Sequence, residues 1–158
     1  MEVSKRKKRK IVWILLLSVA LIFSICFAFE MAHYKDMQYD LYKKIASQCE
    51  NSNFAFPMNR ITDFEWDVAY FDREAYADGK KTRARYQLKG LYLGLGRDDI
   101  ERIIFVSNGE IVKIASMYFY EATFSSPVEM LKPDTILLAE QRQHPYIDRT
   151  TIYLTVKE

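Results

Sequence analysis

Six consecutive basic residues, Lys5 to Lys10, lead directly into nineteen residues without a charge, and this uncharged run over residues 11–29 ends at Glu30. As a helix, the run rises about 28 Å, close to the ~30 Å hydrocarbon core of a bilayer. Large apolar side chains occupy all of its faces, whereas a helix on the surface of a soluble domain keeps a polar side. The sequence therefore predicts a membrane-spanning helix over residues 11–29.

The charges that flank this helix predict its orientation. All six basic residues of the N-terminal segment precede it, and only His33 and Lys35 follow it closely. Because basic flanks stay on the cytoplasmic side of a membrane, we expect residues 1–10 to form a cytoplasmic tail. Residues 30–158 would then lie outside the cytoplasm, held at the cell membrane by a single-pass signal anchor. A tail of this length is too short to fold as an internal output domain.

Two alternatives to an uncleaved anchor fit the sequence less well. A cleaved signal peptide has an apolar region of about 7–15 residues that ends in small residues, whereas this run is longer and ends in Phe27, Phe29 and Glu30. A lipoprotein signal needs small residues just before its modified cysteine, and Cys26 follows Ile25. Both patterns favour the uncleaved anchor.

The formal net charge of +2 is a property of the tail rather than of the whole chain. Six of the 23 basic and one of the 21 acidic residues precede Glu30, so the remainder has 17 basic and 20 acidic residues, a net charge of −3. We therefore expect no nucleic-acid partner. The remaining length is sufficient for one domain with a hydrophobic core.

The two cysteines are not expected to pair with each other, because Cys26 falls inside the predicted span and Cys49 outside it. A domain with one thiol and no disulfide framework is typical of an envelope in which disulfides are not the usual crosslink, as in many Gram-positive bacteria. An intermolecular bond between two copies of Cys49 is the alternative to a free thiol.

After the span, the pattern first predicts a helical stalk over residues 30–53, because Tyr34, Met37, Leu41 and Ile45 form one apolar stripe. This stripe can dock onto the domain, dimerise or lie against the membrane. An extracytoplasmic α+β domain is predicted over residues 54–158.

The domain begins with the clearest strand pattern in the chain. Apolar and polar residues alternate strictly over residues 62–71. Asp72 can then cap a helix over residues 73–88, and Leu91 to Leu95 form a short strand.

The strongest turn signal is Asn108-Gly109, because both positions of such a turn need positive φ. It predicts a hairpin of residues 101–107 and 110–120 that pairs Phe105 with Val112 and Ile103 with Ile114, with one face in the core and the other partly polar. Residues 126–129 read as the capped start of a short helix. Residues 135–140 and 150–156 form a closing pair of strands. Together these elements predict an α+β domain with an antiparallel sheet of about four to six strands and one or two covering helices.

No reaction motif stands out. His33 and His144 have no partner at metal-ligand or catalytic-triad spacing, and no Gly-rich phosphate loop occurs. We expect no catalytic, metal or cofactor site, and no small-molecule substrate. Three groups are instead candidates for binding a partner: an acidic row on the first strand, a basic run on the following helix, and an aromatic pair at the hairpin end. Their residues are Asp63, Glu65, Asp67; Lys80, Lys81, Arg83, Arg85; Tyr118 and Tyr120.

Each group also has a structural interpretation. The acidic row can be the solvated face of a half-buried strand, and the basic run can solvate its helix or pair with the acidic row. The aromatic pair can pack in the core.

The segments Ile61-Thr62-Asp63-Phe64-Glu65-Trp66-Asp67-Val68-Ala69-Tyr70-Phe71 and Ile104-Phe105-Val106-Ser107-Asn108-Gly109-Glu110-Ile111-Val112 are similar to those of small uncharacterised envelope proteins of Gram-positive bacteria. Those proteins carry an N-terminal anchor or lipoprotein signal and a strand of the Phe-x-Trp-Asp type. The resemblance implies a fold and brings no catalytic residues. In layout, the chain also resembles membrane-anchored toxin-immunity proteins.

These observations predict a non-enzymatic binding protein held at the outer side of the membrane, most concretely an immunity protein that occludes a secreted toxin. The alternative is an accessory subunit of envelope machinery for secretion, division or wall synthesis. A less favoured alternative is an envelope hydrolase that uses Asp63, Glu65, Asp67 or His144.

Overall fold

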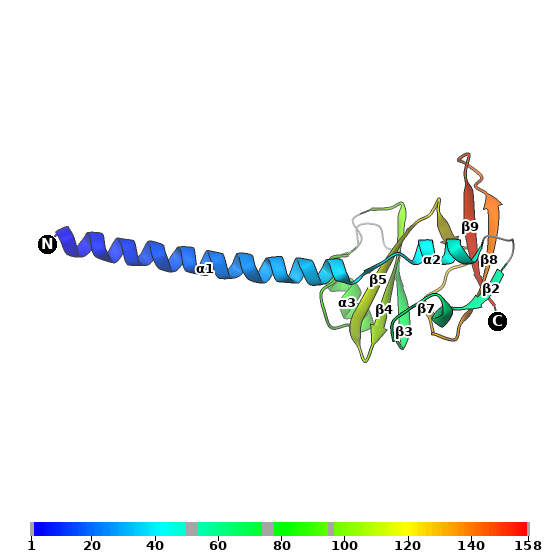
Figure 1. The fold of residues 1–158 in the computed structure, drawn as a ribbon, viewed down its shortest axis with the longest axis horizontal. Coiled ribbons are helices and arrows are strands. Elements are labelled where there is room, and N and C mark those ends of the chain that lie inside the picture. Colours follow the sequence, from blue (N-terminus) through cyan, green and yellow to red (C-terminus); the bar gives the residue numbers. More distant parts are fainter. Residues whose placement is uncertain (1, 50–53, 74–77, 95–96, 158) are drawn as a thin grey trace. The chain divides into compact units, whose positions relative to one another are not determined.

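The computed structural model describes residues 2–49, 54–73, 78–94 and 97–157 (Figure 1). The chain consists of two compact units, Met1–Asp36 and Met37–Glu158. The first unit is one helix, and the second unit contains all of the strands.

The first unit is the helix α1 (Glu2–Asp36). Its Ile11–Asp36 portion is long and apolar enough to cross a membrane, and its most apolar stretch is entirely unburied. The hydroxyls of Ser18 and Ser24 donate to backbone carbonyls four residues earlier, at 2.9 Å each. Polar groups are thus satisfied within the helix, as a hydrocarbon environment requires. The helix predicted over residues 11–29 is confirmed.

The stalk helix predicted over residues 30–53 is broken after Asp36. A two-residue strand, β1 (Gln38–Tyr39), follows, and then the helix α2 (Leu41–Gln48). Asp40 begins α2, because its side chain accepts a hydrogen bond from the backbone N–H of Lys43 at 3.0 Å. Met37, Leu41 and Ile45 are buried, so this part of the predicted stripe packs into the domain. Residues 50–53 lie outside the described residues.

The second unit contains two sheets together with the helices α2 and α3, which confirms the α+β class. One sheet has five strands in the order β1-β5-β4-β3-β7, and the other has four in the order β2-β8-β9-β6. The prediction of one antiparallel sheet is corrected, because β1 pairs with β5, and β6 with β9, in parallel. The remaining elements are β2 (Phe54–Pro57), η1 (Met58–Arg60), β3 (Val68–Asp72), α3 (Gly79–Tyr86), β4 (Ile100–Ser107), β5 (Glu110–Tyr118), β6 (Ala122–Phe124), β7 (Met130–Leu131), β8 (Ile136–Gln143) and β9 (Thr150–Val156).

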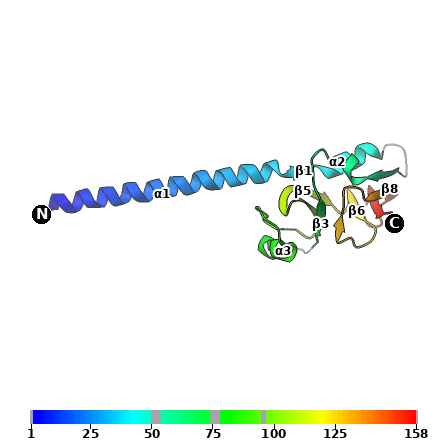
Figure 2. The ribbon, with the colours of Figure 1, turned by 90° about the horizontal axis from the view of Figure 1, so that it is seen from below.

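The main core forms where the two sheets and α2 meet. Phe105 of the five-stranded sheet is fully buried and makes edge-to-face contacts with Phe64 and Trp66, with ring centroids 5.2 and 5.0 Å apart. Leu137 and Leu154 contribute to the same core from the four-stranded sheet. The helices α2 and α3 lie on opposite sides of the five-stranded sheet (Figure 2).

The hairpin predicted around Asn108-Gly109 is confirmed. Both turn residues have positive φ, 52° and 78°, and β4 pairs antiparallel with β5. The predicted register is wrong beyond the turn, because a β-bulge shifts the pairing between Phe105 and Val106. Phe105 therefore lies opposite Lys113 instead of Val112.

The bulge also changes which residues face the core. Ile103 pairs with Ala115, and Ile104 pairs with Ile114. All four residues are fully buried. Around these two pairs, the face of the hairpin that was predicted to be partly polar is therefore not exposed to solvent.

The strand predicted over residues 62–71 is shorter, because only Val68–Asp72 is extended in β3. The preceding residues form a loop in which the indole N–H of Trp66 donates to the hydroxyl of Thr62 at 2.9 Å. That hydroxyl donates to the carbonyl of Met58 at 3.2 Å. The local hydrogen bonds hold a turn where the alternation predicted a strand.

Within β3, Ala69 and Phe71 face the core, whereas Val68 and Tyr70 are only half-buried.

The helix after β3 begins later than predicted. It is capped by Asp78, whose side chain accepts from the N–H of Lys80 at 2.9 Å, and not by Asp72. Gly79 is the first helical residue. A side chain there would lie 2.0 Å from the carbonyl oxygen of Tyr92. Gly79 therefore lets α3 pack closely on the following backbone.

Two further predicted elements are absent from the described residues. Leu91 to Gly94 form only an isolated bridge, between Asp78 and Gly94, instead of a strand, while Leu95 lies outside the described residues. Residues 126–129 form no helix and lead into β7. The carbonyl of Glu129 is instead used by the sheet, because it accepts from the N–H of Phe71 at 3.3 Å. The closing pair, β8 and β9, is antiparallel as predicted.

Candidate functional site

The acidic row of the sequence is dispersed in the structure. Asp63 forms an exposed ion pair with Lys44 of α2, with 3.2 Å between Nζ and Oδ2. Asp67 instead accepts a hydrogen bond from the turn N–H of Asn108 at 2.6 Å. Glu65 is exposed and lines a shallow groove of about 440 Å³ together with Asp67. The row is thus divided: Glu65 and Asp67 line one groove, whereas Asp63 pairs with α2.

The basic run on α3 is divided between two roles. Arg83 donates to the carbonyl of Gly90 at 2.8 Å and therefore fastens the loop that follows the helix. Lys81 and Arg85 line a cavity, whereas Lys80 is exposed outside it.

The predicted aromatic pair comes together at the end of β5. The rings of Tyr118 and Tyr120 are stacked, with centroids 5.0 Å apart and planes 20° apart. The guanidinium carbon of Arg97 lies 5.3 Å from the centre of the Tyr118 ring, and that of Arg149 lies 5.7 Å from the centre of the Tyr120 ring. These four side chains, Arg97, Tyr118, Tyr120 and Arg149, form what we call the aromatic–arginine ladder.

Hydrogen bonds hold two members of this ladder, Arg97 and Tyr120. Arg97 donates to both carboxylate oxygens of Asp99, at 2.8 and 2.6 Å, which raises the pKa of the guanidinium and lowers the pKa of the carboxyl. The carbonyl of Tyr120 accepts from the buried hydroxyl of Thr151 in β9 at 2.8 Å. Loss of solvent, followed by the charge of Glu121, raises the pKa of the Tyr120 phenol.

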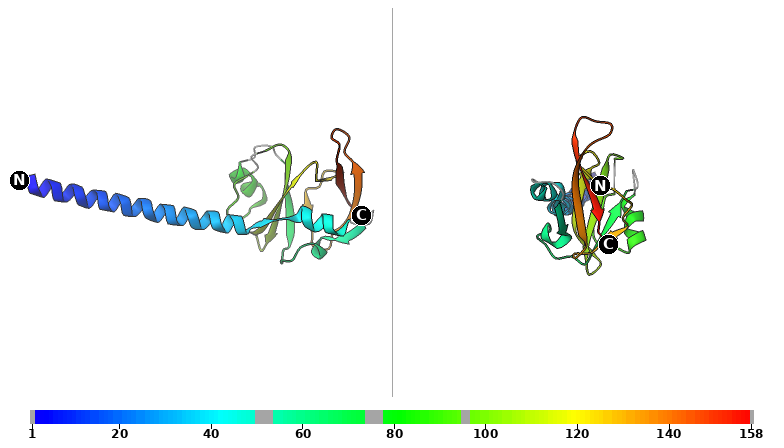
Figure 3. Two further views of the ribbon diagram at one scale, coloured as in Figure 1. Left: turned by 45° about the horizontal axis from the view of Figure 1, so that its top comes forward. Right: turned by 90° about the vertical axis from the view of Figure 1, so that its right-hand side faces the viewer.

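Three further exposed apolar side chains belong to the segments that supply the ladder. Phe119 lies between the two tyrosines in sequence, and Tyr146 and Ile147 precede Arg149 in the loop that joins β8 to β9. Figure 3 shows this loop at the end of the β8–β9 pair. Tyr146 is 90% exposed. The backbone of Arg149 holds this loop, accepting from the N–H of His144 and donating to the carbonyl of Ile147 at 2.8 Å each. We call the ladder together with Phe119, Tyr146 and Ile147 the ladder surface.

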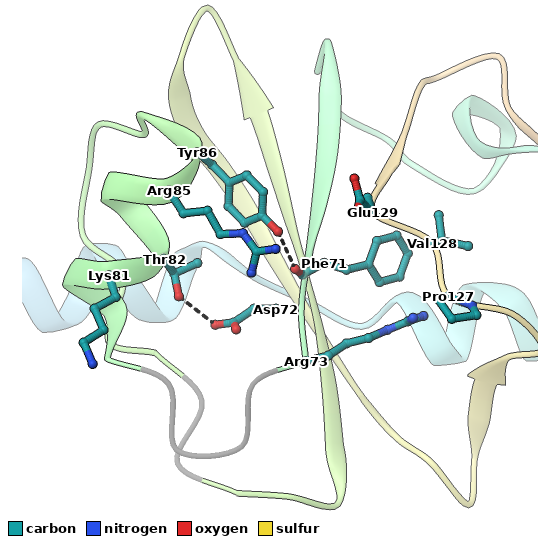
Figure 4. A pocket seen from close by; sticks show the side chains of 10 residues that line it. All are labelled: Phe71, Asp72, Arg73, Lys81, Thr82, Arg85, Tyr86, Pro127, Val128 and Glu129. Carbon is teal, nitrogen blue, oxygen red and sulfur yellow. Dashed lines mark hydrogen bonds between the residues drawn. The ribbon is translucent and has the colours of Figure 1, made fainter.

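A second site is a cavity of about 450 Å³ at the end of β3 (Figure 4). Three segments form its walls: the end of β3, one side of α3, and the stretch before β7. Its lining residues are Phe71, Asp72, Arg73, Lys81, Thr82, Arg85, Tyr86, Pro127, Val128 and Glu129. Sequence analysis assigned only Lys81 and Arg85 among these to partner binding.

Two buried carboxylates organise the cavity. Asp72 is 4% exposed and accepts hydrogen bonds from the hydroxyls of Thr82, at 3.3 Å, and of Tyr92. Glu101 is 1% exposed and accepts from the Nε–H of Arg73. Burial raises the pKa of Glu101, and the charge of Arg73 opposes that rise.

The chemistry available at these sites is recognition through charge and aromatic contact. Among the residues that the structure describes, no group of three or more His, Cys, Asp or Glu side chains is placed to hold a metal ion. His144 contacts Tyr146, whose N–H donates to the imidazole Nδ1 at 3.2 Å. Both Cys26 and Cys49 are free thiols, and Cys49 is buried.

Sequence reasoning missed Arg73, Arg97 and Arg149, which supply most of the positive charge at the two sites. Each lies in or beside a loop and has one partner far along the chain, Glu101, Tyr118 or Tyr120 respectively, so no local pattern connects these pairs. Comparison with known proteins adds no assignment: no family model, no curated protein and no solved structure matches the chain.

Proposed function

We propose that this chain is a single-pass membrane protein whose second unit, Met37–Glu158, binds a protein partner outside the cytoplasm through the ladder surface and catalyses no reaction. The observation that carries this proposal is the ladder itself, a fixed stack of tyrosines between two arginines. Anchoring is supported by an apolar helix that meets the length and composition of a membrane span.

The ladder surface has the composition of an interface hot spot. Tyr and Arg are enriched at the energetically dominant positions of protein interfaces, and aromatic rings lose little side-chain entropy on binding. Stacking already restricts Tyr118 and Tyr120 before a partner arrives. Among the described residues, the guanidinium of Arg149 has a ring contact but no hydrogen-bond partner. Its N–H donors are therefore available for carbonyl or carboxylate groups of a partner.

The orientation follows from charge. The basic residues at 5–10 precede the span, and the positive-inside rule keeps such a segment in the cytoplasm. The domain is then displayed on the other side, where it meets secreted proteins and components of the cell envelope. An anchor raises the effective concentration of a binding domain at the membrane without new contacts.

The most concrete form of this proposal is an immunity protein that occludes a secreted toxin at the outer side of the membrane. The test is a deletion strain challenged with toxins encoded nearby or secreted by the same cells. We expect the deletion to sensitise cells to one toxin, and the Arg149→Gln variant to restore protection poorly. Arg60→Gln is the matched control, since Arg60 is also exposed and also lies over an aromatic ring, that of Phe54, 5.1 Å away.

Three outcomes would each contradict part of this proposal. Unchanged resistance to every such toxin would remove the immunity role. Loss of function when residues 11–29 are replaced by an unrelated span, with the ladder intact, would instead favour an accessory subunit of envelope machinery. Turnover of wall or lipid substrates by the purified full-length chain would contradict the absence of catalysis.

A further inference from the structure

We propose that the cavity at the end of β3 is a binding site for a carboxylate carried on an apolar group, such as the C-terminal residue of a peptide, and that Arg73 is the residue that binds the carboxylate. The cavity shares no residue with the ladder surface, so this proposal stands apart from the proposed function.

Two contacts hold the side chain of Arg73. Its Nε–H donates to the buried carboxylate of Glu101, and its guanidinium carbon lies 4.9 Å from the centre of the Phe71 ring. Figure 4 shows the side chain extending from the end of β3 toward Pro127. A guanidinium held at Nε and on one face is pre-organised, because fewer rotamers are lost when its other donors bind.

Within the described part of the chain, the N–H donors of the Arg73 terminal nitrogens are unused. Its two terminal nitrogens have no hydrogen-bond partner among the described residues, and only 31% of the side chain is exposed. The ammonium of Lys81 on α3 has no partner within the same described part of the chain, and it lines the cavity too. Paired terminal N–H groups of arginine match the two oxygens of a carboxylate.

The charges at the cavity limit the charge of the ligand. The cations Arg73, Lys81 and Arg85 share the lining with the carboxylates of Asp72 and Glu129, and the carboxylate of Glu101 lies behind Arg73. This nearly balanced set disfavours a dianion such as a phosphate monoester, whose second charge would meet the carboxylates. A planar monoanion needs only the local field of Arg73 and is therefore preferred.

Part of the cavity wall is apolar. Four apolar or aromatic side chains line the cavity from both sides: Phe71, Tyr86, Pro127 and Val128. They provide a surface for a hydrocarbon or aromatic group attached to the carboxylate. A cavity of about 450 Å³ is of the size that holds small ligands or one residue of a peptide.

The experiment is ligand-observed NMR titration of the full-length chain in neutral detergent micelles. Three probes share one aromatic body: N-acetylphenylalanine, its uncharged amide, and phenyl phosphate. We expect saturable binding of the carboxylate with a dissociation constant on the order of 1 mM or below, and binding at least about tenfold weaker for the amide and for phenyl phosphate.

The variants localise the binding. Arg73→Gln should weaken binding of the carboxylate about 10- to 100-fold, because it removes a charge-assisted pair. Lys81→Gln should weaken it about threefold, as for an exposed charge. Arg60→Gln is the matched control and should leave the affinity unchanged, since it removes the same charge outside the cavity.

Arg73→Gln also removes the partner of Glu101, so Arg73→Lys is included as a variant that keeps the charge. Thermal unfolding of each variant identifies a loss of folding. Four results would each overturn the proposal: no saturable binding up to about 10 mM, equal binding of acid and amide, tighter binding of phenyl phosphate, or an affinity unchanged in a folded Arg73→Gln variant.

Discussion

The two faces of the five-stranded sheet are buried in different ways. On the face toward the four-stranded sheet, Ile103, Phe105 and Met117 pack in an apolar core. On the face toward α3, Ile104 and Ile114 are equally buried. Here, however, buried polar groups also lie under the covering segment: Asp72, Thr82 and Tyr92 join through hydrogen bonds.

The two faces therefore depend on different contacts. The main core depends on area and shape, because its aromatic contacts are edge-to-face and its side chains are apolar. The α3 face depends on satisfied hydrogen bonds and on a close backbone approach at Gly79. The cavity lies where residues of both faces meet at the end of β3: Phe71 packs in the main core, whereas Asp72 bonds Thr82 of α3.

The largest loss of stability is expected from a substitution on the core face. Phe105→Ala should lower the free energy of unfolding by about 3–5 kcal/mol, because the fully buried ring contacts Tyr39, Phe64 and Trp66. Urea unfolding of the full-length chain in neutral detergent measures this change. A loss below about 1 kcal/mol would place the main core elsewhere.

On the α3 face, the close approach at Gly79 predicts the next largest effect. Gly79→Ala would bring a methyl group to 2.0 Å from the carbonyl oxygen of Tyr92, so the backbone must shift at a cost of about 2–3 kcal/mol. Gly109→Ala is the control: no atom lies within 4 Å of the added carbon, and only its positive φ of 78° is strained, which costs about 1 kcal/mol. Equal losses in the same unfolding assay would contradict close packing at Gly79.

The hydrogen-bond network predicts a smaller loss. Tyr92→Phe removes a hydroxyl that donates to the buried carboxylate of Asp72 and should cost about 1–3 kcal/mol. Tyr146→Phe, at a position 90% exposed, should change stability by less than about 0.5 kcal/mol. If the two variants unfold alike, the α3 face does not depend on this bond.

The smallest expected effect is a change in how stability depends on pH in the alkaline range. Burial, and then the charge of Asp63, raise the pKa of Tyr39 from 10.0 to about 12. The folded chain therefore holds this proton more tightly than the unfolded chain. The stabilisation is complete below pH 10 and is lost as pH rises through 12. Tyr39→Phe should flatten this part of the stability curve in a pH series of unfolding experiments, and an identical decline in wild type and variant would show that another group titrates.

Local sequence signals predicted the parts of the fold that local chemistry controls. The uncharged run at 11–29 and the Asn108-Gly109 turn each carry their own physical cause. Alternation failed at residues 62–67, because a turn linking Trp66, Thr62 and Met58 competes with extension. The α+β class could be inferred from the order of elements.

Contacts between distant segments could not be inferred in this way. The parallel pairing of β1 with β5 joins residues 38–39 to residues 114–115, and no local pattern encodes it. Of the candidate site, Tyr118 and Tyr120 were predicted from their position at the hairpin end. Their flanking arginines, Arg97 and Arg149, come from separate loops, so only the folded chain brings them together.

Site-specific photo-crosslinking in intact cells tests the central claim most directly. A photoreactive phenylalanine replaces Tyr146 on the ladder surface and, in a second strain, Leu93, which is also exposed but lies outside that surface. We expect one defined protein to be crosslinked from position 146. This product should be absent from position 93 and should be lost in the Arg149→Gln background. The same products from both positions, or none from position 146, would contradict partner binding through the ladder surface.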